Sequence, residues 1–164
     1  MIPSVETIDR LARRAETKPT EAQKEAGNYQ KGHISLHGLN IAIENPRGSI
    51  RTGVNKKTGK KWSSRLPDHY GYIKRTEGAD GDHVDTYIGR DLKSERAFII
   101  DQMKDDNGEF DEHKVMLGYP MAHKAIDAYK RAFSDGKGLD RIGGITETTI
   151  DGFKDWLKNG DTKS

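Results

Sequence analysis

The spacing of apolar residues divides this chain into helical ends and a middle rich in strands. Residues 4–14 place apolar side chains at helical spacing, and residues 20–27 begin with the pattern of a capping box, so we expect two short helices there. Between residues 33 and 119 the apolar residues instead alternate with polar ones or form short β-branched runs, as strands do. We expect strands at 33–37, 39–44, 49–54, 60–65, 70–73, 84–88, 96–100 and 110–119.

The last part of the chain returns to a helical pattern. One apolar stripe covers residues 120–133 and a second covers residues 148–157. Short strands followed by helices predict an α+β fold, with the strands curled into a barrel. We expect residues 1–31 to form a helical segment that packs on one domain of residues 32–164.

Three carboxylates lie within the six residues Asp80-Gly81-Asp82-His83-Val84-Asp85. Gly81 lets the backbone turn sharply, so the carboxylates can converge. Unit charges about 4 Å apart interact by ~1 kcal/mol in water and ~4 kcal/mol at an effective dielectric near 20, so without a cation they would repel. The spacing departs from a calcium loop because an aspartate occupies the position of the required glycine. It favours an oxygen-only magnesium or manganese site over a solvated acidic turn.

Composition limits the classes of protein that fit. The chain has 164 residues, 32% hydrophobic and 33% charged, enough for one compact core. No apolar run approaches the roughly 18 residues of a membrane-spanning helix, and the N-terminus lacks a secretory signal pattern. The absence of cysteine excludes disulfides, zinc-thiolate sites and a thiol nucleophile. We therefore expect a cytoplasmic soluble protein.

Charge is unevenly distributed along the chain. Residues 46–75 contain nine basic residues and one acid, whereas residues 76–112 contain twelve acids and four bases. A site for a metal-bound phosphate needs both, because carboxylates hold the ion and Lys or Arg holds the phosphoryl oxygens. The alternative is a basic hairpin that binds nucleic acid.

These residues resemble the soluble family I inorganic pyrophosphatases. The run Tyr70-Gly71-Tyr72-Ile73 before the aspartate cluster is similar to the family signature, as is Ile43-Glu44-Asn45-Pro46, and the likeness covers roughly residues 39–114. Residues 27–29 and 110–114 further resemble a pyrophosphatase-like domain of phage and mobile-element proteins. The resemblance implies a five-stranded barrel with flanking helices, magnesium as cofactor, and hydrolysis of diphosphate to two phosphates.

The resemblance also implies roles for single residues. Asp80 and Asp85 would ligate the metal and Asp82 would activate the attacking water. Glu44 would hold a further metal at the rim. The side chains expected to contact phosphate are Arg51, Arg65, Tyr70, Lys114, Tyr129 and Lys130.

The second metal-binding segment remains open between Glu112 and Asp111. Strand alternation favours Glu112, because it lies on the same face as Lys114. The upstream partner of this segment would be Asp101 or Asp105.

Two positions depart from the family pattern: Gly53 replaces a glutamate and Leu66 replaces a tyrosine. These changes leave open a larger substrate, so the alternatives are hydrolysis of a nucleotide-type diphosphate linkage, or a non-catalytic module that binds nucleic acid or protein. The expected partner is diphosphate or a small molecule containing it. We expect no membrane or nucleic-acid partner, and the sequence leaves homo-oligomerisation open.

Overall fold

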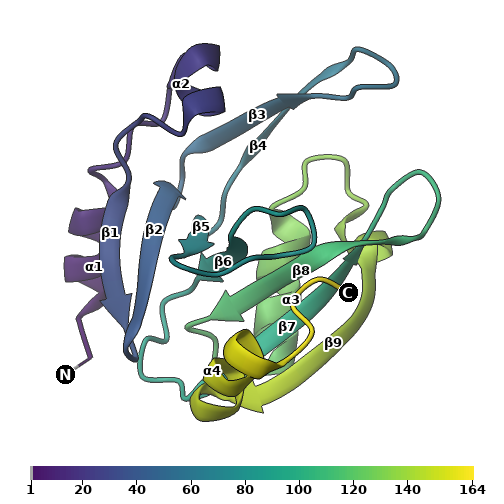
Figure 1. Ribbon diagram of the computed structural model, residues 1–164. Helices are drawn as coiled ribbons and strands as arrows, with labels where there is room; N and C mark the ends of the chain where they lie inside the picture. The colour runs from purple at the N-terminus through teal and green to yellow at the C-terminus, as the bar shows by residue number, and fades with distance from the viewer. Residues whose placement is uncertain (1) are drawn as a thin grey trace.

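The computed structural model describes residues 2–164, which form a seven-stranded sheet and a separate two-stranded hairpin (Figure 1). The strand order in the large sheet is β1-β2-β5-β6-β8-β7-β9, and β3 pairs with β4 in the hairpin. No helix among these residues is long and apolar enough to span a membrane. The elements are α1 (Val5–Ala12), α2 (Glu21–Ala26), β1 (Gly32–Leu36), β2 (Leu39–Asn45), β3 (Ile50–Val54), β4 (Lys61–Arg65), β5 (His69–Ile73), β6 (Val84–Ile88), β7 (Arg96–Met103), β8 (Phe110–Leu117), α3 (Ala122–Arg131), the 3-10 helix η1 (Gly138–Arg141), β9 (Ile142–Thr149) and α4 (Ile150–Asn159).

The large sheet separates two apolar cores. Side chains alternate between the faces of a strand, and β7 shows this clearly: Ile99 packs with α1 and α4, while Phe98 and Ile100 pack with α3. Phe153 of α4 is fully buried in the first core, and Tyr129 of α3 is fully buried in the second. The face covered by α3 is called the α3 face below.

A parallel pair of strands, β6 and β8, brings distant parts of the sequence together. Their register places Asp85 opposite Lys114, and the antiparallel β5 lies on the other side of β6 with Tyr72 opposite Asp85. Asp85 shares its face with Tyr87, and Lys114 shares its face with Met116; both of these partners belong to the core under α3. The acidic segment and the later lysine therefore meet on the α3 face.

The predicted α+β class is confirmed, but closure into a five-stranded barrel is not. β1 and β9 form the two edges of the sheet, and no pairing joins them among residues 2–164. The sequence reasoning also missed β9. Most of its side chains are exposed and it contains Gly143 and Gly144, so it shows no apolar alternation; its pairing with β7 defines it.

The first two helices form where the sequence predicts them. The Ser4 hydroxyl accepts a hydrogen bond from the backbone N–H of Thr7, and Thr20 and Gln23 form the expected capping box. Only α1 contributes buried residues. The division at residue 31 stays a prediction.

Asp9 links α1 to the large sheet through contacts with Arg47 and with His69 of β5. Its Oδ1 lies 2.7 Å from His69 Nε2 and 2.8 Å from Arg47 Nη1, and His69 is 2% exposed. Burial lowers the pKa of His69, so the neutral imidazole is favoured in the folded protein. Burial opposes ionisation of Asp9, but His69 and Arg47 outweigh it and lower the pKa of that carboxyl.

We expect Asp9→Ala to destabilise the fold by about 2 kcal/mol at pH 7.5, because two hydrogen-bonding groups lose their acceptor. Urea unfolding measures this, with Glu6→Ala on the exposed side of α1 as the control. The folded pKa of Asp9 is depressed, so its contribution is present above its unfolded value of 3.8 and is lost as the pH falls through the folded value. Equal stability of both variants at pH 7.5 would show that the contact contributes nothing.

Candidate functional site

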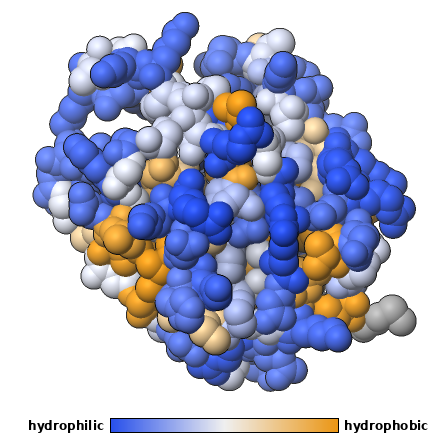
Figure 2. All heavy atoms as spheres, turned by 180° about the vertical axis from the view of Figure 1, so that it is seen from behind, coloured by the Kyte–Doolittle hydropathy of each residue, from blue (hydrophilic) through white to orange (hydrophobic). Residues whose placement is uncertain are grey.

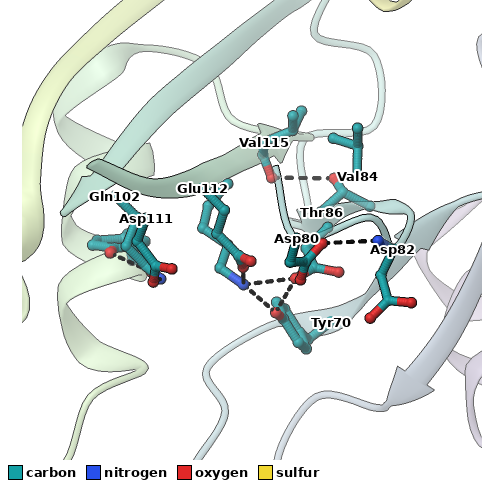
Figure 3. A network of polar contacts seen from close by, with 12 residues as sticks. Tyr70, Asp80, Asp82, Val84, Thr86, Gln102, Asp111, Glu112 and Val115 are labelled. Carbon is teal, nitrogen blue, oxygen red and sulfur yellow. Dashed lines mark hydrogen bonds and ion pairs between the residues drawn. The ribbon is translucent and has the colours of Figure 1, made fainter. Parts of the chain in front are cut away.

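Four side chains from three strands converge on the α3 face. The buried Lys114 Nζ donates to the Tyr70 hydroxyl at 2.7 Å and to Asp85 Oδ2 at 2.7 Å, and it also forms an ion pair with Glu112. The Tyr70 hydroxyl donates to the same Asp85 oxygen at 2.9 Å. Figure 3 shows the Tyr70 and Glu112 side chains pointing toward one another around this contact. We call these four residues the Lys114 cluster.

The charges within the Lys114 cluster depend on one another. Burial opposes the charged ammonium, but Tyr70, Asp85 and Glu112 outweigh this and raise the pKa of Lys114 well above its usual value. Burial also opposes the Asp85 carboxylate, yet Lys114 lowers its pKa. Glu112 is left as the weaker acid, because burial and the neighbouring Asp85 raise its pKa to about 7. The single positive charge of Lys114 therefore does not fully offset the cost of burying the negative charges of both Asp85 and Glu112.

Aromatic rings and an arginine border the cluster. The rings of Tyr70 and Tyr87 lie 4.6 Å apart, and both are buried. The Arg51 guanidinium lies 4.9 Å from the centre of the Tyr70 ring and 5.7 Å from that of Trp62, so it reaches back from the hairpin toward the sheet. Burial raises the pKa of both tyrosines, which keeps their hydroxyls protonated as hydrogen-bond donors.

The acidic loop before β6 lies beside this cluster, but only Asp85 is in contact with it. Asp80 accepts a hydrogen bond from the backbone N–H of Asp82 at 3.0 Å, as Figure 3 shows. Asp80 and Asp82 are both exposed. No hydrogen bond or ion pair of the Asp82 carboxylate is found among residues 2–164. The predicted water-activating residue is thus accessible and unpaired in the described part of the chain.

Asp111 and Glu112 of β8, the two candidates for the second metal-binding segment, both lie near the α3 face. Glu112 is opposite Gln102 and Phe110 is opposite Met103, so Asp111 is an extra residue that bulges from the strand. The bulge directs Asp111 to the Gln102 amide, which donates to it at 3.0 Å (Figure 3). The Tyr129 hydroxyl in turn donates to the Gln102 oxygen at 2.7 Å. Glu112, rather than Asp111, joins Lys114.

The two candidates for an upstream acidic partner lie away from the cluster. Asp101 is opposite His113 on β7 and β8, and its Oδ1 lies 3.0 Å from His113 Nδ1. His113 packs against Trp156 of α4, which places this pair on the face opposite Lys114. Asp105 is exposed and forms an ion pair of 3.4 Å with Arg141.

The remaining predicted residues lie at the edge of the site. Glu44 accepts a hydrogen bond from the Tyr29 hydroxyl, and both line a cavity of about 280 Å³ that also includes Arg51 and Tyr70. Arg65 points elsewhere, since its guanidinium donates to the Gly48 carbonyl at 2.6 Å. Lys130 is exposed on α3.

Sequence reasoning missed three residues near the cluster: Tyr29, Tyr87 and Gln102. Tyr87 follows Asp85 by two positions in a predicted strand, so the alternation of side chains could have placed it on the same face. Tyr29 reaches Glu44 from the segment before β1, and Gln102 lies beside a bulge. The sequence marks Tyr29 only through the resemblance of residues 27–29 to phage domains, which assigned it no role, and no local pattern signals Gln102.

The donor chemistry of the site suits a hard divalent ion. Asp85 and Glu112 both direct a carboxylate oxygen to Lys114 Nζ, and burial, with a smaller contribution from Asp85, raises the pKa of Glu112 despite the nearby lysine. No three His, Asp or Glu side chains among the described residues lie close enough together to form a complete metal-binding group. The described structure therefore contains two carboxylates suited to a metal site, Asp85 and Glu112, but not a complete set of ligands.

The chain is similar to several solved structures and matches one family model. Among solved structures, the chain is similar to an inorganic pyrophosphatase from Helicobacter pylori, with 19% identity, 72% of this chain and 90% of that chain covered, and a TM-score of 0.43. It is similar to one from Neisseria gonorrhoeae, with 20% identity, coverage of 77% and 94%, and a TM-score of 0.40. A third, from Coxiella burnetii, has 16% identity, coverage of 72% and 89%, and a TM-score of 0.42.

No curated protein sequence matches the chain. A family model described as Inorganic Pyrophosphatase matches residues 21–158, which is most of this chain. The match includes all four members of the Lys114 cluster and the acidic loop. The chain therefore belongs to the inorganic pyrophosphatase family.

Proposed function

We propose that this chain hydrolyses inorganic diphosphate to two phosphates at the Lys114 cluster, with magnesium as its cofactor. One observation carries the proposal: two carboxylates converge on a buried lysine, within a segment that matches the inorganic pyrophosphatase family. Manganese has the same preference for oxygen ligands and is the alternative ion.

The positive groups account for binding of the substrate. Diphosphate is highly charged, and Lys114 and Arg51 offer an ammonium and a guanidinium at 5.2 Å and 4.9 Å from the centre of the Tyr70 ring. In this proposal both neutralise phosphoryl oxygens, and the Tyr70 hydroxyl donates a hydrogen bond to the same group. Preorganised donors of this kind stabilise the charge that moves to the leaving phosphate.

In this proposal the acidic groups bind the magnesium ion and activate the attacking water. Asp85 and Glu112 would supply two carboxylate ligands to magnesium. Asp80 in the adjacent loop is the expected third ligand, although in this structure it does not lie close enough to complete a group of three. When bound, the ion neutralises phosphate charge and makes water acidic enough to attack at neutral pH. Asp82 would take the proton from the attacking water, since its exposed carboxylate is free to accept one. Glu44 would hold a further ion at the rim, with Tyr29 as its hydrogen-bonding partner.

The role of Asp82 offers a test of the proposal. We expect Asp82→Ala to lower kcat for magnesium-dependent phosphate release by about 10²- to 10³-fold, because general base catalysis of this kind contributes typically 10²–10⁴-fold. Thermal unfolding should remain within about 1 °C, since the side chain is exposed and unpaired. Phosphate release is followed colorimetrically.

The matched control is Asp127→Ala, because Asp127 is exposed on α3 and pairs with Arg131 outside the site. The control should retain wild-type kcat. Full activity of Asp82→Ala would remove Asp82 from the mechanism and assign proton transfer to another group.

A further inference from the structure

A cavity near the Lys114 cluster is larger than inorganic diphosphate requires. Its volume is about 540 Å³, and it lies between the hairpin β3–β4 and the segment that follows α3. Arg51 and Tyr87 line its inner end, next to Tyr70. Figure 2 shows the molecule from behind, with an opening between the hairpin and the body at the upper left. Pockets of this size typically hold small organic ligands.

An exposed indole forms one wall of this cavity. Trp62 is 39% exposed and lies opposite Gly53 in the hairpin. A Cβ added at Gly53 would lie 2.3 Å from the indole, so the ring occupies the space that any side chain at position 53 would need. Glycine at this position, where a glutamate was expected from the family pattern, is therefore what allows the ring to lie flat across the strand pair.

The opposite side of the cavity is also aromatic and basic. Phe133 lines it, with the Arg141 guanidinium 4.4 Å from the centre of its ring. Lys60 and Lys61 line the cavity from the hairpin and Lys137 lines it from the segment after α3, and no ion pair is found for these lysines among residues 2–164. Arg141, in contrast, pairs with Asp105 and Asp135, which also line the cavity. A ligand that combines a planar ring with negative charge fits these walls, since rings stack on aromatic side chains and lysines attract anions.

Arg51 connects the two parts of the site. Its guanidinium is near both aromatic rings, at 5.7 Å from the centre of the Trp62 ring and 4.9 Å from that of Tyr70. A phosphate held by Arg51 would therefore carry any attached group toward Trp62. Inorganic diphosphate has no such group and leaves the indole unused.

We infer that the cavity binds the base of a nucleoside diphosphate and that this class of compound is a second substrate of the chain. This inference rests on the proposed function, because it assigns the terminal phosphate to the Lys114 cluster. Trp62 stacks on the base, and the lysines of the cavity face the ribose and its phosphate.

The reaction is the same hydrolysis with a larger leaving group. The water oxygen bonds to the terminal phosphorus, and the bond from that phosphorus to the bridging oxygen breaks. The bridging oxygen keeps the electron pair and leaves with the nucleoside monophosphate. The proton of the water passes to a carboxylate and then to solvent, so ADP and water give AMP and phosphate with no other reactant.

The test compares ADP with inorganic diphosphate in the magnesium-containing protein. We expect AMP formation by the wild type, and a KM for ADP about ten-fold higher in Trp62→Ala, because loss of stacking costs about that much. The KM for inorganic diphosphate should change less than two-fold. Val54→Ala removes another exposed side chain of the hairpin and should leave both KM values unchanged.

A binding measurement keeps the test valid if Trp62→Ala folds poorly. In Trp156→Phe the only tryptophan is Trp62, so its fluorescence reports on the cavity. ADP should quench it by stacking, whereas inorganic diphosphate should quench it much less. If the protein hydrolysed inorganic diphosphate but neither hydrolysed ADP nor showed quenching of Trp62 fluorescence by ADP, this inference would be overturned and the proposed function would stand. Hydrolysis of neither substrate would overturn both.

Discussion

Replacing Asp85 by asparagine is expected to lower kcat for diphosphate hydrolysis by about 10³-fold or more. Asp85 meets both Lys114 and Tyr70 through one oxygen, so it orders the two groups proposed to bind phosphate. It is also one of two carboxylates available to hold magnesium at that point, and loss of one charged ligand removes most of the ion's contribution. Asparagine keeps the shape and an acceptor oxygen, so the fold should survive.

Steady-state phosphate release at saturating magnesium measures this effect. Asp151→Asn is the control, because Asp151 is exposed in the first turn of α4 and belongs to the other face of the sheet. Magnesium should raise the melting temperature of the wild type but not of Asp85→Asn. An Asp85→Asn enzyme with kcat within ten-fold of the wild type would show that the reaction takes place elsewhere.

Lys114→Met is expected to cost about 3 to 5 kcal/mol of stability at pH 8, because it leaves two neighbouring carboxylates without their buried counter-charge. The loss should be smaller at pH 5. Glu112 has a pKa of about 7 in the folded wild type, raised by burial and by Asp85 from 4.5. Because the pKa of Glu112 is higher in the folded state, its protonation stabilises the fold. This contribution to stability is fully present below pH 4.5 and is lost as the pH rises through about 7.

Urea unfolding in the presence of a chelator, at pH 5 and pH 8, measures both effects. Lys130→Met is the matched control, since Lys130 is exposed on α3 and its loss should change stability by less than about 0.5 kcal/mol. If Lys114→Met lost the same free energy at both pH values, repulsion between Asp85 and Glu112 would not be the cause.

Local patterns predicted those parts of the fold and site that depend on neighbouring residues. Period-2 alternation located the strands of the sheet centre, and it correctly placed Glu112 on the same face as Lys114. The Asp85 position also followed from sequence, because β6 carries it directly into the sheet. The sequence did not reveal β9, whose apolar pattern is too weak for an edge strand to be recognised.

Features that depend on tertiary contacts could not be predicted. The sequence offered Asp101 as an acidic partner, but the β7–β8 register places it beside His113 on the opposite face. Arg65 was expected at the phosphate, but the structure directs it to the Gly48 carbonyl. The position of Trp62 over Gly53 likewise depends on the pairing of β3 with β4. Register and topology, rather than residue type, decide each of these cases.

Phosphate release from inorganic diphosphate by the purified wild-type chain, with magnesium and then with a chelator, tests the central claim most directly. We expect release in magnesium and none in chelator, because Asp85 and Glu112 would then repel the substrate with only Lys114 and Arg51 to offset them. No release under either condition, from a protein that is folded and stabilised by magnesium, would contradict the proposal that this member of the family is a diphosphate hydrolase.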